Sequence, residues 1–394
     1  MKILFCIDRF RPSRGGAESY LDALAAALIS RGHDVRVGAA EIDEDRLGPN
    51  LLLQVPPWPR LLREYCLAKI PARFRREGKF DLVVAFRHAL DCDLFQPHGG
   101  LHADSLAGAV RPLARHRFLQ GLLYGRKLLS PKNLLFLWID RLLLRRRPPV
   151  AVAALSAMTE NSIRRRAAAG TEIAVIANGV DRARFHPALR AAHRDRILDA
   201  ARIDRRARVG LFCGHNLLLK GLGEALRGVG LFAGDHPDFH LLVAGRQKAA
   251  RYERLAAKLA IGDRVHFLGS CDEMEALYGA SDVLLHPTWY DPCSLVVLEA
   301  LGAGVPVITS RYNGAAELMT SGREGVVVDD PGDARAIDEA LRTILGSDLQ
   351  LFRQRAARLG EKHCFSNHVD AMERLLLHIL DQRQRSQKRD HEFS

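Results

Sequence analysis

The chain has 394 residues, of which 47% are hydrophobic and 26% are charged, proportions typical of a soluble globular protein. This length is enough for two domains with buried cores, and no apolar run approaches the length of a membrane span. The formal net charge of +12 indicates an anionic partner, such as a phosphorylated ligand, nucleic acid or an acidic lipid surface. The seven cysteines form no CxxC pair, which favours free thiols in a reducing cytosol over disulfides or a zinc site.

The first forty residues predict the opening of a parallel doubly wound sheet. A strand at 2–7 is followed by a glycine-rich loop, an amphipathic helix at 18–32 and a second strand at 33–40. Gly15 and Gly16 lie in the loop, where backbone N–H groups can approach a phosphate or a sugar. A structural Gly-Gly turn is the alternative, since the dinucleotide pattern GxGxxG is absent.

A second alternation of strands and helices begins at ARVGLFCGHN, residues 207–216. The link before it, at about 182–206, has lost strand character. Two such rounds predict an α/β protein with two domains. We place the first domain at 1–185, the second at 186–365, and a C-terminal helix and tail that cross back to the first domain at 366–394.

The stretch TWYDPCSLVVLEALGAGVPVIT, residues 288–309, combines a helix opening with a buried helix. Asp291 can cap free N–H groups and Pro292 fits the first helical position, so we expect the helix to open there. The following CSLVVLEAL is apolar on nearly every face, yet it carries Glu299. A carboxylate in that position is costly unless a neighbouring residue or a ligand bonds to it.

The stretch FCGHNLLLKG predicts a strand that ends at Cys213 and a loop that leads into a helix near Gly221. Ligands of open α/β sheets bind at the carboxyl ends of strands, where this loop carries His215 and Lys220. Lys220 is therefore placed to hold a diphosphate as a point charge. A solvated surface lysine is the alternative.

Taken together, GGAE, SAMT, IANGVDRARFHP, GHNLLLKG, VHFLG, GVVVDDPGD and the block from Asp291 to Glu317 resemble retaining glycosyltransferases of family four. The likeness runs from Met1 to about Asp333, and within the family it is greatest to lipopolysaccharide-core glucosyltransferases. It implies the GT-B fold, with two Rossmann-like doubly wound domains facing across a cleft. The first domain would bind the acceptor and the second the nucleotide sugar.

The resemblance also implies roles for individual residues. Glu299 would accept hydrogen bonds from the ribose hydroxyls of the donor, which would make its burial tolerable; pairing with an arginine in the core is the alternative. Asp291 would hold the sugar hydroxyls. The rest of the donor site would comprise Gly15, Gly16, His215, Pro292, Cys293, Ser294 and Leu295, and the catalytic group would comprise Asp291, His98 and Lys220.

Two positions depart from the family pattern. Asp291 stands where the family usually has a glutamate, which is one methylene longer. His215 replaces the diphosphate-binding arginine, so Arg246 or Lys248 could share the charge with Lys220.

The sequence DCD at Asp91–Asp93 matches the DxD pattern of metal-dependent glycosyltransferases. Because the pair precedes a strand, and because the family fold uses no metal, we expect neither a metal nor another cofactor. No residue stands out as a covalent nucleophile. The resemblance implies a front-face route in which the departing phosphate accepts the acceptor proton.

A basic insertion at 105–148 interleaves leucine and aromatic residues with arginine and lysine, and between Arg111 and Arg147 only Asp140 opposes the positive charge. Such a segment suits the interface of an anionic bilayer. The alternative is a helical insertion that packs its leucines on the first sheet.

The sequence thus predicts a cytoplasmic enzyme, peripheral on the inner face of the cell membrane. It would transfer a hexose, namely glucose from UDP-glucose, to a lipid-linked or phosphorylated glycan such as a lipopolysaccharide core. The alternatives are a same-fold transferase with a soluble acceptor, a nucleotide-sugar epimerase, or a basic nucleic-acid-binding protein. Nucleic acid is not an expected partner, since no RRM, KH, zinc-finger or helix-turn-helix signature is present.

Overall fold

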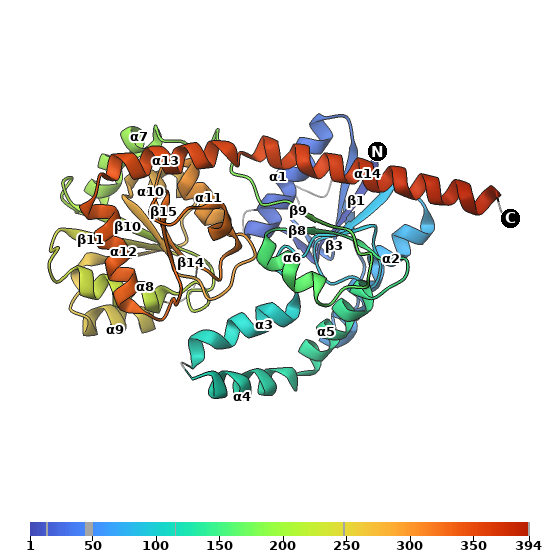
Figure 1. Cartoon of the computed structure of the whole chain (residues 1–394), viewed down its shortest axis with the longest axis horizontal. Helices are drawn as coiled ribbons and strands as arrows, with labels where there is room; N and C mark the ends of the chain where they lie inside the picture. The colour runs from blue at the N-terminus through green and yellow to red at the C-terminus, as the bar shows by residue number, and fades with distance from the viewer. Residues whose placement is uncertain (13–14, 44–49, 115, 247–248, 393–394) are drawn as a thin grey trace. The chain divides into compact units, whose positions relative to one another are not determined.

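The computed structural model of the chain describes residues 1–12, 15–43, 50–114, 116–246 and 249–392 (Figure 1). Residue contacts divide the chain into two compact units. The first unit comprises Met1–Ala107, Gly121–Ala177 and His368–Ser394, and the second comprises Gly108–Gln120 and Asn178–Asn367. Each unit therefore contains segments that are distant in sequence.

The first unit is built on a seven-stranded sheet in the order β5-β3-β1-β6-β7-β8-β9, with every neighbouring pair parallel. Ile3, Leu4 and Phe5 in the central strand are fully buried, as expected for a parallel sheet covered on both faces. The strands are β1 (Lys2–Cys6), β3 (Asp34–Ala39), β5 (Leu51–Leu52), β6 (Leu82–Ala85), β7 (Leu94–Phe95), β8 (Ala151–Ala154) and β9 (Ile173–Val175). A separate parallel pair, β2 (Arg9–Phe10) and β4 (Glu41–Ile42), follows β1 and β3.

The helices of the first half alternate with these strands, and the basic insertion forms further helices (Figure 1). They are α1 (Gly16–Ser30), α2 (Arg60–Glu77), α3 (His102–Val110), η2 (Arg111–Leu113), α4 (Arg117–Leu128), α5 (Pro131–Leu144) and α6 (Ala157–Arg164). No helix in the described parts of the chain is long and apolar enough to cross a bilayer.

The C-terminal helix α14 (Phe365–Glu392) is bonded to the first unit from residue 368 onward. Arg31, at the end of α1, donates to Glu373 and to Asp370, each at 2.6 Å. The buried ring of His368 lies between two partners, the Tyr20 hydroxyl at 2.8 Å from Nε2 and the Ala177 carbonyl at 2.7 Å from Nδ1. Since a carbonyl only accepts, Nδ1 carries a proton.

His368 is expected to make the protein less stable as the pH falls. Burial lowers its pKa from the usual 6.5 to about 4, so between these values the unfolded chain binds a proton that the folded chain does not. Because of this group, the free energy of unfolding should be roughly 2 kcal/mol lower at pH 5 than near pH 7. Denaturant unfolding at the two pH values tests this, and the loss should be smaller by that amount in His368→Gln. An equal loss in the variant would contradict the assignment.

The second unit is built on a six-stranded parallel sheet in the order β12-β11-β10-β13-β14-β15. Its strands are β10 (Arg208–Cys213), β11 (Phe239–Ala244), β12 (Val265–Gly269), β13 (Val283–His286), β14 (Val307–Ser310) and β15 (Gly325–Val328). Its helices are α7 (Leu189–Ala200), α8 (Leu222–Phe232), α9 (Ala250–Lys258), η3 (Gly262–Arg264), α10 (Met274–Ala280), α11 (Leu295–Gly302), η4 (Gly314–Leu318), α12 (Ala334–Gly346) and α13 (Leu349–Lys362).

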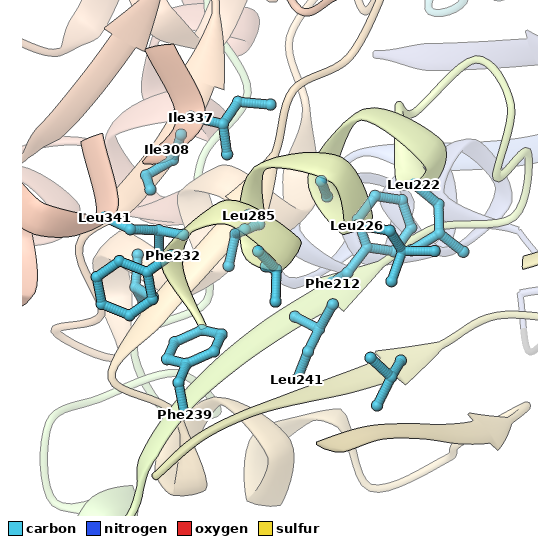
Figure 2. Packing of buried hydrophobic residues seen from close by; sticks show 14 of the residues in the cluster. Phe212, Leu222, Leu226, Phe232, Phe239, Leu241, Leu285, Ile308, Ile337 and Leu341 are labelled. Atoms are coloured by element: carbon cyan, nitrogen blue, oxygen red, sulfur yellow. The ribbon is translucent and has the colours of Figure 1, made fainter. Parts of the chain in front are cut away.

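The core of the second unit lies between this sheet and the helices α8 and α12 (Figure 2). Phe212 and Leu241 project from the strands toward Leu226 on α8, and all three are fully buried. α8 and α12 approach so closely that a Cβ on Gly228 would lie 2.3 Å from Ile337 Cγ2. Glycine at 228 is therefore what lets these two helices meet.

Both sheets have a point at which the strand order reverses direction. In the second unit β10 is followed outward by β11 and β12, whereas β13, β14 and β15 extend the other way. In the first unit the corresponding point lies between β1 and β6. Such switch points open a crevice beyond the carboxyl ends of the strands, where ligands of open α/β sheets bind.

Candidate active site

At the switch point of the second unit, a lysine and a histidine surround one carboxylate. Lys220 Nζ contacts Asp291 Oδ2, and Nε2 of the fully buried His286 lies 3.9 Å from the same oxygen. Burial alone would raise the pKa of the Asp291 carboxyl, but Lys220 and His286 outweigh it and hold this pKa well below its usual value. Burial lowers the pKa of His286. The site therefore presents an ionised carboxylate with an ammonium group beside it.

The loop that carries Lys220 is fastened to the segment that carries Asp291. The Leu219 carbonyl accepts from Trp289 N at 2.8 Å and from the Thr288 hydroxyl at 3.1 Å. Gly221, the N-cap of α8, has φ +83°, and a Cβ there would lie 2.1 Å from the Pro287 carbonyl oxygen. Only glycine satisfies both conditions, so the sequence KG fixes how α8 starts and where Lys220 lies.

Glu299 is half-buried on α11, while its neighbours Leu298 and Ala300 are buried. Its Oε2 accepts a hydrogen bond of 2.8 Å from the hydroxyl of the fully buried Tyr278. Burial raises the pKa of Glu299, and the Tyr278 bond opposes this rise. One hydroxyl proton leaves most of the acceptor capacity of a carboxylate unused.

The alternative in which Glu299 pairs with an arginine is wrong within the described part of the chain. No guanidinium there lies within ion-pair distance of Glu299, and the nearby Arg184 instead donates to Glu275 at 2.7 Å. The partner is Tyr278, from α10, which the sequence did not single out.

The predicted helix opening at Asp291-Pro292 is also wrong, because α11 begins at Leu295 with Ser294 as its N-cap. Long-range bonds hold residues 291–294 outside the helix. Asp291 N donates to the Tyr312 carbonyl at 2.9 Å, and Ser294 N donates to Asn313 Oδ1 at 3.2 Å. Asp291 Oδ1 accepts from Cys293 N at 3.2 Å, which closes a turn rather than a helix. Pro292, Cys293 and Ser294 are buried in this turn, and Leu295 is half-buried.

The other predicted phosphate ligands have different positions. His215 lies largely exposed on the loop after β10, and partial desolvation of its ring, followed by the positive charges of Arg246 and Lys220, lowers its pKa. Arg246 is also exposed and donates from Nε to the Ser270 hydroxyl at 3.3 Å. Lys248 lies outside the described residues. The second unit thus brings Lys220, Asp291 and His215 to one edge of its sheet.

Gly15, Gly16 and His98 line one cavity of about 460 Å³ at the switch point of the first unit. Gly15 is the N-cap of α1, and His98 stacks on Tyr20 with ring centroids 4.7 Å apart. Asp8 and Arg87, which contact each other, lie in the same cavity. The predicted site residues therefore form two groups, one in each unit.

The carboxylates of the DCD sequence are held by arginines. Arg75 donates to Asp93 at 2.7 Å and to Asp91 at 2.8 Å, and Arg146 contacts Asp91. Among the residues that the structure describes, no group of histidine, cysteine, aspartate or glutamate could hold a metal ion. Asp91 and Asp93 thus have a structural role within the first unit.

Two family models match the chain. The one described as Glycosyltransferase Family 4 covers residues 14–184, and the one described as Glycosyl transferases group 1 covers residues 194–363. The chain belongs to these glycosyltransferases. The predicted family is thereby confirmed, and the group 1 domain is the one that contains Lys220, Asp291 and Glu299.

Curated relatives of this glycosyltransferase chain match it over part of their length. Lipopolysaccharide glucosyltransferase WaaG of Escherichia coli K12 is 35% identical over 105 residues, which is 27% of this chain and 28% of WaaG. A D-inositol 3-phosphate glycosyltransferase of Mycolicibacterium vanbaalenii is 30% identical over 219 residues, 51% of this chain and 46% of that protein. The chain thus spans between about a quarter and a half of these relatives.

Solved structures confirm the predicted GT-B fold. The crystal structure of WaaG, a glycosyltransferase involved in lipopolysaccharide biosynthesis, has a TM-score of 0.79 and 21% identity, covering 95% of this chain and 99% of that one. Anabaena HepE in complex with UDP-glucose has a TM-score of 0.68 and 19% identity, again covering 95% and 99%.

Sequence reasoning missed three buried residues of this glycosyltransferase site. His286, Tyr278 and Asn313 each contact a predicted residue through a side chain. A signal for His286 exists, since a histidine that ends the apolar strand VLLH faces the ligand edge of a parallel sheet. Tyr278 and Asn313 give no comparable signal, because their partners are far away in sequence.

Proposed function

We propose that the protein is a retaining glycosyltransferase that moves a hexose, specifically glucose from UDP-glucose, onto a lipid-linked or phosphorylated glycan. The observation that carries the proposal is the pairing of an ionised Asp291 with Lys220, together with a half-buried Glu299 whose carboxylate has spare acceptor capacity. A nucleotide sugar has a diphosphate for the ammonium group and hydroxyl donors for both carboxylates.

In this proposal Glu299 accepts hydrogen bonds from the ribose hydroxyls, and Asp291 with the backbone at 292–295 holds the sugar. Lys220, with His215 beside it, neutralises the leaving diphosphate. Asp291 itself is engaged by Lys220, which fits a role in positioning and charge stabilisation rather than nucleophilic attack. The departing phosphate then accepts the proton of the acceptor hydroxyl, and that hydroxyl attacks from the face which the nucleotide leaves.

The acceptor side of the proposal rests on the first unit, where His98 lines a cavity together with Gly15 and Gly16, the two glycines that the resemblance assigns to the donor site. That WaaG is a lipopolysaccharide glucosyltransferase favours a lipopolysaccharide-core acceptor. That HepE was crystallised with UDP-glucose favours that donor.

A donor-and-acceptor assay tests the proposed activity. With UDP-, GDP- and ADP-glucose, we expect the largest thermal stabilisation from UDP-glucose, and transfer with retained anomeric configuration to a lipopolysaccharide-core glycan. Chelation with EDTA should leave turnover unchanged, since no metal is proposed. A new nucleotide sugar formed without any acceptor would indicate an epimerase instead, and the absence of nucleotide-sugar binding would refute the proposal.

We further propose that the enzyme is cytoplasmic and rests on the inner face of the cell membrane through its basic helices. Large apolar side chains of this segment are exposed, with Phe118 at 82%, Leu129 at 79% and Leu122 at 64%. Phe136, Ile139 and Leu143 of α5 are buried instead, so α5 packs on the first unit while Phe118, Leu122 and Leu129 keep apolar surface in contact with solvent. Basic and apolar side chains together fit an anionic interface.

Vesicle sedimentation tests the membrane contact. The change Phe118→Ser with Leu122→Ser should reduce binding to phosphatidylglycerol vesicles by about tenfold or more, since each buried apolar side chain contributes ~1.5–3 kcal/mol. The matched control is Leu351→Ser, an exposed leucine on α13 of the second unit, which should bind as the wild type does. Equal binding of all three proteins would support a packing role alone.

A further inference from the structure

Beyond the cavity with Gly15 and His98, the first unit has a larger cavity of about 750 Å³. It lies at the same edge of the sheet, where β2 and β4 extend past β1 and β3 with Arg9 opposite Glu41 in register. Its volume is within the range of small-molecule sites. This cavity belongs neither to the donor site nor to the cavity around His98.

The two cavities are neighbours, since Arg9 lines both of them, and a third cavity shares residues with each. Ile7, Asp8 and Arg87 line both the His98 cavity and a small central one of about 30 Å³. Leu53 and Glu64 line both the central cavity and the large one. The three cavities thus lie next to one another along the carboxyl ends of the strands, and we call this row of cavities the groove.

The far end of this groove is cationic. Four cations from three elements line it, Arg9 after β1, Arg60 and Arg63 on α2, and Lys132 on α5, against two carboxylates, Glu41 and Glu64. Glu41 holds Arg63 at 2.7 Å and lies 3.7 Å from Arg9, and Glu64 lies 3.4 Å from Lys132. Asp8 also lies 4.0 Å from Arg9, so three carboxylates lie against the four cations and orient them while one positive charge remains in excess.

The local structure of α2 adds to this potential. Arg60 and Arg63 both lie in its first turn, which contains no acidic residue, and the N-cap Pro59 offers no side-chain acceptor. Cations at a helix N-terminus are unfavourable in isolation, because the N-terminus already has a positive potential. The side chain of Arg63 is only 20% exposed, so solvent screens it incompletely. An anion in the cavity would relieve this concentration of positive charge.

We propose that Arg9, Arg60, Arg63 and Lys132 form a subsite for an anionic substituent of the acceptor glycan, either a phosphate or a sugar carboxylate. The inference rests on the proposed function and assigns one end of the acceptor to a fixed position. A glycan whose reacting sugar occupies the cavity with Gly15 and His98 extends along the groove, and its anionic group reaches the cationic end. The enzyme thereby selects charged acceptors.

Ligand titration on the full chain tests the subsite with glucose 6-phosphate, glucuronate and glucose as probes. We expect the two anionic sugars to bind at least tenfold more tightly than glucose, with affinity that falls as salt rises. Tighter binding of glucose 6-phosphate would identify phosphate as the group recognised, and tighter binding of glucuronate would identify a carboxylate. If the wild type binds glucose as well as the anionic sugars, the subsite is overturned.

The variant Arg60→Gln with Lys132→Gln should weaken binding of the anionic probe by about tenfold or more while leaving glucose unaffected. Arg63→Gln, which removes a different cation of the same subsite, should also weaken binding of the anionic probe. The matched control, Arg254→Gln with Lys258→Gln, removes the same charge from exposed positions of α9 and should bind as the wild type does. Equal weakening in the control would show a net-charge effect and overturn the proposal. All of these proteins should still bind UDP-glucose. If the wild type does not bind UDP-glucose, the result contradicts the proposed function and not the subsite.

Discussion

Glu299→Ala is expected to lower kcat/KM by roughly two to four orders of magnitude, because it removes two hydrogen bonds between the donor ribose and a charged group, each worth about 1.5–3 kcal/mol. The protein should remain folded. Tyr278, which loses its partner, has a second acceptor in the Val296 carbonyl at 3.2 Å. Initial rates against donor concentration, together with the temperature of unfolding, measure both expectations.

Glu339→Ala is the matched control for this experiment. Glu339 is an exposed carboxylate on α12 of the same unit, so its loss removes one negative charge away from Glu299. We expect activity close to that of the wild type. Activity retained in Glu299→Ala would falsify the ribose assignment, whereas a marked drop in its unfolding temperature would indicate that Glu299 has a structural role.

Lys220→Gln is expected to lower kcat/KM by about a hundredfold or more, because the leaving diphosphate loses its point charge. It should also destabilise the fold by ~3–5 kcal/mol, since Asp291 is left as an unpaired charge in a buried site. The pKa of Asp291 lies below the usual 3.8 in the wild type, so Asp291 contributes stability above that value and loses it as the pH falls. The stability difference between wild type and variant should therefore shrink as the pH falls below 3.8.

The double variant Lys220→Gln with Asp291→Asn separates these two effects. With no buried charge left unpaired, stability should return toward the wild-type value, while activity stays low because the ammonium group and the Asp291 carboxylate are both missing. Kinetics at pH 7 and denaturant unfolding of all three proteins provide the comparison. Recovery of activity along with stability would show that Lys220 serves the fold alone.

The strands and their order of appearance could be predicted because buried parallel strands are uniformly apolar. Local rules of the same kind gave a wrong helix start in the stretch at 288–309. Asp-Pro satisfies the local rules for a helix start, but Asn313 and Tyr312, which hold residues 291–294 in a turn, come from the far side of β14. Local propensity cannot register a hydrogen bond whose partner is determined only by the folded sheet.

A site residue could be predicted from the sequence where its position depends on residues close to it in the chain. Lys220 follows a strand that could be predicted from its apolar residues, so its position at the ligand edge followed from the sequence. The partner of Glu299 did not, since Tyr278 lies in a different helix and its ring is covered by core residues. The cationic groove of the first unit escaped notice for the same reason, because Arg9, Arg63 and Lys132 become neighbours only after β1, α2 and α5 have assembled.

The membership of α14 in the first unit bears on how the chain is made. A ribosome releases the residues of the second unit, 178–367, before those of α14, so the second unit can mature while the first still lacks His368 and Glu373. Until residues 368–373 have been made, the Tyr20–His368 and Arg31–Glu373 contacts of the first unit cannot form. Although it begins at the N-terminus, the first unit is thus the last to be completed, and a stop codon shortly before residue 368 would damage the opposite end of the sequence.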